Sequence, residues 1–437
     1  MTTIHRHVSL EVSKDTSMLD KAKSAVFQAR NLVLPDKTKN LTADDVQKAR
    51  RYIADYWKEL ERFHPNDDKT LVGLPYPYLI PSQDGSYGFN ELYYWDSYFM
   101  VQSMMDKDHI QLVKGVAEDL LTLMQRFHII PNASRTYFTG RSQPPLLTSI
   151  IFDVYKIEQD KMWLEKAIAI AKEEYENVWM GTAQPNWRQV YRGLSRYYDI
   201  NTLHDLAEAE SGWDMTTRFG RRALHYLPVD LNALLYKYET DFAEAARILG
   251  NEGQALDWQA KANDRKETMD ELMWSKTFGI YYDYNYKKDK RGTVSSLATY
   301  YPMWAGMVTD KQAKQLVKTL RKFEHKGGLS TTDNQPISQL VPGSMPVQWA
   351  YPNGWAPLHF MVVQGLERYG YHEDAERIAH KWLHTNLIWF NKHGEFVEKY
   401  NVANPNKPAS EGVYPSQKGF GWTNAIFERF CQDYIDQ

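Results

Sequence analysis

Apolar residues recur at helical spacing along most of this chain. The first stripe follows Thr42 and comprises Val46, Ala49, Ile53, Trp57 and Leu60. Comparable stripes occupy residues 113–124, 163–171, 231–248, 360–369 and 375–387, and a last helix is expected from about residue 423 to 434. Strand signals are few, and residues 279–284 and 395–397 are candidates for short hairpin arms. The pattern predicts an all-α fold of about ten or more helices joined by long loops.

The polar segments indicate how the chain is organised. No Pro/Gly/Ser-rich linker or low-complexity tract divides it, but the first forty residues lack periodicity and end in the polar segment 35–40. We therefore expect an N-terminal extension over residues 1–40 and a single domain over residues 41–437.

Composition and charge exclude several classes of protein. The chain has 437 residues, of which 43% are hydrophobic and 24% charged, a balance typical of a globular core. Its 52 basic and 55 acidic residues are interspersed, which argues against a nucleic-acid partner. One cysteine, Cys431, fits a reducing compartment. No signal peptide and no run of 18 apolar residues is visible, so we expect a cytoplasmic protein without a membrane partner; the oligomeric state is not indicated.

The aromatic residues give the first indication of chemistry. The chain has 14 Trp, 29 Tyr and 17 Phe. A large core alone can hold many aromatics, but here many stand beside Gly, Pro, Asn, Gln and carboxylates in segments that do not resemble core. Indole and phenol rings pack against sugar faces while their polar tips bind hydroxyls. Long loops in a compact domain usually carry function. We therefore look for a sugar site in the loops.

Six motifs stand in these segments: Tyr93-Tyr94-Trp95-Asp96-Ser97-Tyr98, Arg141-Ser142-Gln143-Pro144-Pro145, Ser211-Gly212-Trp213-Asp214, Pro352-Asn353-Gly354-Trp355-Ala356-Pro357, Val397-Glu398-Lys399-Tyr400 and Gly419-Phe420-Gly421-Trp422-Thr423-Asn424. In composition and order they resemble the motif series of the trehalase family, over roughly residues 74–430. The resemblance implies an (α/α)6 barrel, or toroid, as one catalytic domain. It also implies hydrolysis of an α-glucoside such as α,α-trehalose with inversion, without metal or cofactor.

The resemblance implies that Asp214 is the general acid and Glu398 the general base. The chemistry needs two carboxyl groups, because the leaving oxygen must be protonated while a water is deprotonated on the opposite face of the sugar. The two groups of an inverting enzyme stand about 6.5–9.5 Å apart. Burial against Trp213 would raise the pKa of Asp214, and Lys399 would help to keep Glu398 ionised. A second interpretation is that Asp214 merely caps a helix that begins near Thr216.

The glucose site is assigned by similarity. The residues expected to bind sugar hydroxyls are Trp95, Asp96, Asn132, Arg141, Gln143 and the backbone carbonyl of Gly212. The residues expected to form the walls of the pocket are Phe89, Gln348, Trp349, Trp355 and Trp422. Alternatives remain open, since Arg141 also fits an ion pair, Asp96 a buried cap and Trp355 plain core.

The sequence departs from the family pattern at positions that concern the second sugar. Ser86-Tyr87-Gly88-Phe89 lacks the arginine of the family's Gly-Gly-Arg-Phe, Ala350 stands where the family has aspartate, and Val413 replaces a carboxylate. The segment between residues 199 and 212 is short and lacks an Arg-x-Glu pair. A site that loses such polar groups discriminates less strictly. We therefore expect a remodelled acceptor subsite.

These departures leave two alternative functions. One is hydrolysis of another α-glycoside, such as glucosylglycerate, mannosylglycerate or a related disaccharide. The carboxylate of a glycerate aglycone would bind a basic residue near the altered segment. Five basic residues are candidates for this role, and each of them equally fits a solvated helix face: Arg192, Arg196, His204, Arg218 and Arg221. The other is a non-catalytic sugar-binding protein, which retention of both Asp214 and Glu398 disfavours.

No metal site is predicted. The chain has neither His-Glu-x-x-His nor paired cysteines, as a zinc site would need. Asp283, Asn285 and Asp289 resemble a calcium loop only weakly, without its glycine and its final glutamate, and a turn between strands is the better interpretation. The expected partner is a small disaccharide or glucoside.

Overall fold

The computed structural model describes residues 42–83, 88–335, 347–412 and 414–436. The chain divides into two compact units, residues 1–43 and residues 44–437. The expected extension over residues 1–40 lies outside the described residues, so its limits stay a prediction.

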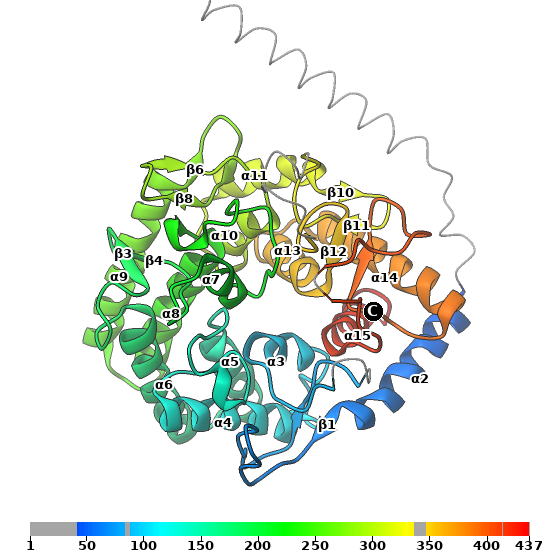
Figure 1. The fold of residues 1–437 in the computed structure, drawn as a ribbon, viewed down its shortest axis with the longest axis horizontal. Coiled ribbons are helices and arrows are strands. Elements are labelled where there is room, and N and C mark those ends of the chain that lie inside the picture. The colour runs from blue at the N-terminus through cyan, green and yellow to red at the C-terminus, as the bar shows by residue number, and fades with distance from the viewer. Residues whose placement is uncertain (1–41, 84–87, 336–346, 413, 437) are drawn as a thin grey trace, which may run out of the picture. The chain divides into compact units, whose positions relative to one another are not determined.

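Outer and inner helices alternate along the second unit. The outer helices are α2 (Ala43–Leu60), α4 (Ile110–Phe127), α6 (Lys161–Glu173), α9 (Glu252–Leu272), α11 (Asp310–Thr319) and α14 (His372–His393) (Figure 1). The inner helices are α3 (Tyr94–Met100), α5 (Leu147–Glu158), α8 (Val229–Ile248), α10 (Tyr301–Trp304), α13 (Ala356–Arg368) and α15 (Gly421–Tyr434). Each inner helix contacts the next, and α15 returns to α3, so the inner ring closes. The predicted (α/α)6 barrel is confirmed.

The sequence explains the two layers. In the outer helix α4, the predicted stripe of Val113, Val116, Leu120 and Met124 is buried, while its opposite face is polar. The inner helix α13 is covered on all sides, and residues 356–363 are buried without interruption. Helix starts are capped where the sequence allows it: the Asp160 side chain accepts two backbone N–H groups at the start of α6.

Short elements and loops connect the helices. The short helices are η2 (Thr136–Phe138), η3 (Glu174–Trp179), α7 (His204–Glu210), η4 (Ala223–His225), η5 (Leu297–Tyr300) and η6 (Leu320–Lys322). The antiparallel strand pairs are β1 (Glu61–Arg62) with β2 (Tyr78–Leu79), β3 (Gln189–Tyr191) with β4 (Leu194–Ser195), β6 (Trp274–Ser275) with β7 (Ile280–Tyr281), β10 (Glu324–His325) with β11 (Gly328–Leu329), and β12 (Asn353–Trp355) with β13 (Lys399–Asn401). One sheet has three strands, β5 (Tyr226–Leu227), β8 (Tyr284–Asn285) and β9 (Lys290–Arg291).

The two strand predictions had different outcomes. The arm expected at residues 279–284 is confirmed, because β7 pairs with β6 and Tyr284 begins β8. The arm expected at residues 395–397 is wrong, because the strand begins at Lys399 and Val397 makes only an isolated bridge to Lys418.

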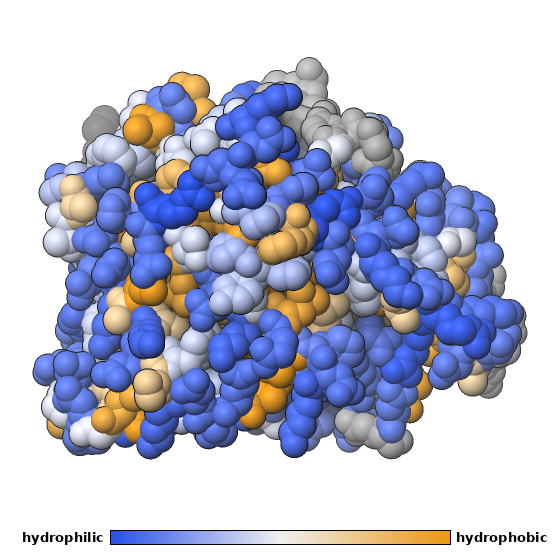
Figure 2. All heavy atoms as spheres, turned by 90° about the horizontal axis from the view of Figure 1, so that it is seen from below, coloured by the Kyte–Doolittle hydropathy of each residue, from blue (hydrophilic) through white to orange (hydrophobic). Residues whose placement is uncertain are grey.

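Three inner helices, α3, α13 and α15, begin beside one another, because Trp95 and Trp355 at their starts both contact Trp422. Trp95 and Asp96 lie in the first turn of α3, Trp355 directly precedes α13, and Trp422 is the second residue of α15. These helix starts therefore gather backbone N–H groups and positive helix dipoles. The side drawn in Figure 2 is mostly hydrophilic, with hydrophobic residues in small separate groups. None of the helices in the described ranges combines the length and apolar character needed to cross a bilayer.

Candidate active site

A cavity of about 220 Å³ lies where these loops and helix starts meet. Eleven of the thirteen predicted site residues line it: Phe89, Trp95, Asp96, Asn132, Arg141, Gln143, Gly212, Asp214, Trp349, Glu398 and Trp422. Larger cavities of about 420 to 510 Å³ occur elsewhere in the described part of the chain, but none of the thirteen residues lines them. The structure thus brings together loops that lie far apart in the sequence.

The two remaining predicted wall residues, Gln348 and Trp355, do not line the cavity and lie behind its wall. Trp355 has no exposed surface and stacks on Trp349, with 3.7 Å between ring centroids and 2° between planes. Trp355 is therefore a core residue, as the alternative interpretation had it. The Gln348 amide donates from Nε2 to the backbone carbonyl of Asp214 at 2.6 Å. Both residues support parts of the wall that face the cavity.

Gly212 lets the chain pass close to Trp95. It adopts φ +72°, and a Cβ atom there would lie 2.6 Å from Cε2 of the Trp95 indole. Only glycine tolerates both the left-handed backbone and this approach. As a result the peptide at Gly212 lies against the ring, and Gly212 and Asp214 both line the cavity.

The Asp214 carboxyl is held in a poorly solvated environment. It is exposed only where it lines the cavity, and protein atoms enclose its other sides. Its pKa is raised from 3.8 to about 7, mainly by burial and also by the charge of Glu398, while Arg141 and Lys399 oppose the rise. At neutral pH this group therefore retains its proton in a substantial fraction of molecules.

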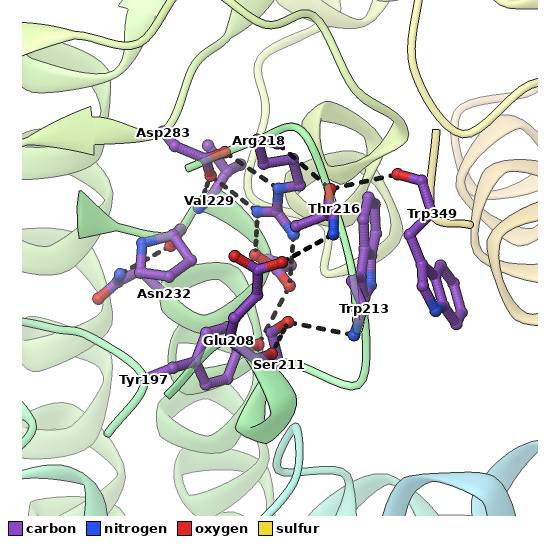
Figure 3. Close-up of polar contacts among 12 residues, drawn as sticks. Tyr197, Glu208, Ser211, Trp213, Thr216, Arg218, Val229, Asn232, Asp283 and Trp349 are labelled. Carbon is purple, nitrogen blue, oxygen red and sulfur yellow. Dashed lines mark hydrogen bonds and ion pairs between the residues drawn. The ribbon is translucent and has the colours of Figure 1, made fainter. Parts of the chain in front are cut away.

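Hydrogen bonds fix the backbone on both sides of Asp214 (Figure 3). The buried Glu208, on α7, accepts the Thr216 N–H through Oε1 at 2.7 Å. The Thr216 hydroxyl donates to the Trp349 carbonyl at 3.2 Å, and the Trp213 N–H donates to the Ser211 hydroxyl oxygen at 3.1 Å. Residues 213–216, which contain the proposed acid and are called the acid segment below, are thus bonded to α7 on one side and to the loop before α13 on the other.

Behind this segment lies a buried charged cluster. The guanidinium of Arg218 stands 4.3 Å from the centroid of the Trp213 ring and is held by Asp230 and Asp283 at 2.5 and 2.7 Å (Figure 3). Trp213 in turn stacks on Trp349, with centroids 5.5 Å apart. Asp283, considered above for calcium, is thus a partner of Arg218.

Glu398 lies in an environment unlike that of Asp214. Its Oε2 accepts from Lys399 Nζ at 2.7 Å, and its Oε1 accepts from the Tyr414 hydroxyl at 2.9 Å. Pairing of β12 with β13 sets Lys399 opposite Trp355, and the Trp422 indole donates to the Glu398 carbonyl at 3.2 Å. Each oxygen of this carboxyl therefore has a hydrogen-bond donor of its own.

Asp96 is a third carboxyl in the same cavity. Its pKa is raised to about 8, mainly by burial and also by the charges of Glu398 and Asp214, while a hydrogen bond from Gln143 opposes the rise. Gln143 also accepts the Trp95 N–H at 3.0 Å, which fixes the amide. Asp96 is therefore mostly protonated at neutral pH and can donate a hydrogen bond.

Arg141 fits both of the interpretations given for it, a place in the cavity and an ion pair. It lines the cavity and also pairs through Nη1 with Asp199 Oδ2 at 3.2 Å, while its guanidinium stands 5.1 Å from the Phe138 ring centroid. The ion pair and the ring hold the arginine in place, with part of its surface left toward the cavity.

The basic residues considered for an anionic substrate do not line this cavity. Arg218 is enclosed by its aspartates, and Arg192 and Arg221 pair with Glu271 and Asp205. Arg196 donates to the Leu224 carbonyl, and the His204 ring contacts His225. The altered position Ala350 is buried against Val347, whereas residues 84–87 and Val413 lie outside the described residues.

Six residues line the cavity without having been predicted: Pro81, Tyr93, Phe138, Ala209, Tyr414 and Phe420. Tyr93 and Phe420 stand inside the quoted motifs, so their neighbours could have drawn attention to them. Tyr414 had a weaker signal, because its contact with Glu398 spans sixteen residues of loop. Within the described ranges, no group of three or more His, Cys, Asp or Glu side chains is arranged to hold a metal ion.

Comparison with known proteins identifies the family of the chain. The trehalase family model matches residues 8–203 and 182–434. Cytosolic neutral trehalases of Beauveria bassiana and Kluyveromyces lactis are 33% and 32% identical to the chain over 82% of its length, and the matches cover 58% and 56% of those proteins. The chain thus spans little more than half the length of these curated relatives.

Solved structures give the same fold. Neutral trehalase Nth1 from Saccharomyces cerevisiae matches with a TM-score of 0.71 and 29% identity, over 91% of this chain and 80% of that chain. A GH63 mannosylglycerate hydrolase from Thermus thermophilus in complex with glucose matches with a TM-score of 0.63 at 18% identity, over 87% of this chain and 99% of that chain. The chain belongs to the trehalase family.

Proposed function

We propose that the protein is an inverting glycoside hydrolase that cleaves α,α-trehalose into two glucose molecules in the cytosol. Family membership supports the reaction, and the curated relatives are named as cytosolic neutral trehalases. The observation that carries the proposal is the pair of carboxyl groups, Asp214 and Glu398, which line one cavity in opposite environments. Burial raises the pKa of Asp214, whereas each oxygen of Glu398 accepts a hydrogen bond from a separate donor.

The reaction follows from these two carboxyl groups. Glu398 takes a proton from a water molecule as that water attacks the anomeric carbon. Asp214 gives its proton to the glycosidic oxygen as the bond to the anomeric carbon breaks. Afterwards Asp214 is ionised and Glu398 protonated, and exchange of protons with solvent restores the starting state. A pKa of about 7 makes Asp214 a suitable acid near neutral pH, because a general acid is most efficient when its pKa lies close to the working pH.

The remaining wall suits one glucose unit. Trp95, Trp349 and Trp422 supply apolar surface, and Asp96, Asn132, Arg141 and Gln143 supply hydrogen-bonding groups of fixed length. A protonated Asp96 adds a donor without adding a third negative charge beside Asp214 and Glu398. We assign these residues to the glucose that carries the reacting carbon.

An anionic aglycone is not favoured. The five basic residues considered for glycerate have partners elsewhere, and the basic residue that lines the cavity, Arg141, is held by Asp199 on the glucose side. A substrate panel of α,α-trehalose, kojibiose, maltose and glucosylglycerate tests this choice, and we expect trehalose to have the highest kcat/KM. A higher value for glucosylglycerate would refute the proposed substrate while leaving the proposed acid and base open.

Proton NMR of the first products tests the mechanism. Inversion at the attacked carbon of α,α-trehalose releases one β-glucose, while the leaving glucose keeps its α configuration. We therefore expect equal initial signals of the two anomers. Two initial α-glucose molecules would indicate retention and would overturn the single-displacement mechanism, whatever the rate.

A further inference from the structure

Tyr414 contacts both members of the buried ion pair that contains the proposed base. Its hydroxyl donates to Glu398 Oε1 at 2.9 Å, and its ring centroid lies 5.4 Å from Lys399 Nζ. The Trp355 ring lies on Lys399 as well, at 5.1 Å. The ammonium of Lys399 is therefore surrounded by a carboxylate and two aromatic rings, which supply negative charge and negative ring faces.

The carboxyl of Glu398 has a separate donor on each oxygen. Lys399, the next residue in the chain, holds Oε2, and Tyr414, from the loop that follows β13, holds Oε1. The exposed fractions of the Lys399 and Glu398 side chains are 0% and 2%, so bulk water replaces neither donor easily. A buried ion pair is tolerated only where its remaining hydrogen-bonding positions are satisfied. Tyr414, which also lines the cavity, satisfies one of them on the substrate side.

We propose that Tyr414 is a positioning residue for the base, which fixes the plane of the Glu398 carboxylate and keeps it ionised while the cavity is closed by substrate. This inference rests on the proposed function, because it gives Glu398 the role of base. Two donors from different segments prevent the carboxylate from rotating about its last bond. A hydrogen bond to an ionised acceptor is also stronger than one between neutral groups.

Other charged groups face Glu398 from the neighbouring elements. They are Asp96 on α3, Asp214 on the acid segment and Lys399 on β13. Removal of only the phenol oxygen of Tyr414 deletes none of these three charges, and the other hydrogen-bond partner of that oxygen, Gln348, is uncharged. A difference between wild type and Tyr414→Phe therefore reports the lost donor, since the other groups act equally in both proteins.

The direction of the effect follows from the charge. Without the phenol donor, protonation of Glu398 becomes easier, so the acidic limb of the kcat/KM profile moves to higher pH. A charge-assisted hydrogen bond of ordinary strength corresponds to a shift of about one pH unit. The loss of kcat/KM in Tyr414→Phe relative to wild type is therefore about tenfold larger on the acidic limb than at the optimum. The alkaline limb, which reports Asp214, stays in place.

The experiment compares Tyr414→Phe with Tyr93→Phe in the full chain. Tyr93 lines the same cavity, but its hydroxyl donates to Glu91 at 3.0 Å, so its removal deletes one phenol oxygen from the wall without touching Glu398. We expect the acidic limb to move only in Tyr414→Phe. Equal positions of this limb in wild type and Tyr414→Phe would overturn the inference, as would an equal shift in both variants.

A second measurement does not depend on turnover. A cationic, glucose-like iminosugar binds best when Glu398 is ionised, and calorimetry over a pH series gives the midpoint at which binding is lost. We expect this midpoint to rise by about one pH unit in Tyr414→Phe. If wild type binds the iminosugar but leaves trehalose intact, the proposed substrate fails and the Tyr414 comparison still stands. No binding to wild type at any pH would overturn both proposals.

Discussion

The Asp214 carboxyl should make the protein active and less stable at once. Burial raises its pKa from 3.8 to about 7, and one unit corresponds to about 1.4 kcal/mol. A group whose pKa is higher in the folded state binds more protons there, so its contribution to stability falls as pH rises from about 4 to about 7. The full penalty above pH 7 is roughly 4 kcal/mol, an upper bound because cavity water screens part of the charge.

Asp214→Asn removes this penalty. Relative to wild type, the free energy of unfolding of the variant should increase by roughly 2–3 kcal/mol between pH 5 and pH 8. The unfolding entropy is about 2.1 cal/mol/K per residue, so the Tm of the variant should rise relative to wild type by about 3 °C over that pH range. Differential scanning calorimetry at four or five pH values measures the trend. Asp257→Asn, at an exposed position of α9, is the control and should show no trend.

Activity should change in the opposite direction. Loss of a general acid lowers the rate by about 10²–10⁴-fold for trehalose, whose leaving group needs a proton. Hydrolysis of α-glucosyl fluoride should fall far less in Asp214→Asn, because fluoride leaves without protonation. A Tm difference that is constant with pH would refute the burial argument. Trehalose turnover near the wild-type level would refute the acid role of Asp214.

Substitutions at three further positions test the supporting groups. Lys399→Met removes the cation 2.7 Å from the proposed base, so the acidic limb of kcat/KM should move up by more than one pH unit, and an unmoved limb contradicts this role. Gly212→Ala places a Cβ 2.6 Å from an indole at φ +72° and should lower the free energy of unfolding by about 2–4 kcal/mol; denaturant titration showing less than 1 kcal/mol would count against the packing argument. Burial raises the pKa of Glu208 to about 8, so Glu208→Gln should keep the bond to Thr216 and stay within about threefold of wild-type kcat at pH 7. Glu208→Leu should lose more than tenfold, and equal rates for the two variants would argue against positioning by this hydrogen bond.

Much of the fold could be predicted because its helices are amphipathic over many turns. The stripe in α4 alone specifies which face is buried, whatever packs against it. The strand pairing could not be predicted in the same way. Phe396 and Val397 have high strand propensity, but the register that aligns Trp355 with Lys399 starts the strand two residues later. Pairing depends on a distant partner, so a local pattern does not contain it.

The site divides along the same line. Motif resemblance identified residues that face the cavity, but did not separate them from neighbours that support its wall. Gln348 and Trp355 belong to the same segments as Trp349, yet they point into the protein, where one binds the Asp214 carbonyl and the other stacks on a ring. Tyr414 shows the converse, since its importance comes from a contact with Glu398 that no spacing in the sequence reveals.

Nearness in sequence to Asp214 also does not predict which residues line the cavity. Arg218 is four residues away, and a free guanidinium there would suit an anionic aglycone, but two aspartates and the Trp213 ring enclose it. Its charge is therefore balanced by the two aspartates, and its guanidinium packs on the Trp213 ring next to Asp214. Among the described residues, none of the five basic residues considered for an anionic aglycone lines the cavity. Selection among α-glucosides should then depend mainly on the glucose that carries the reacting carbon, because the described residues assemble that half of the site.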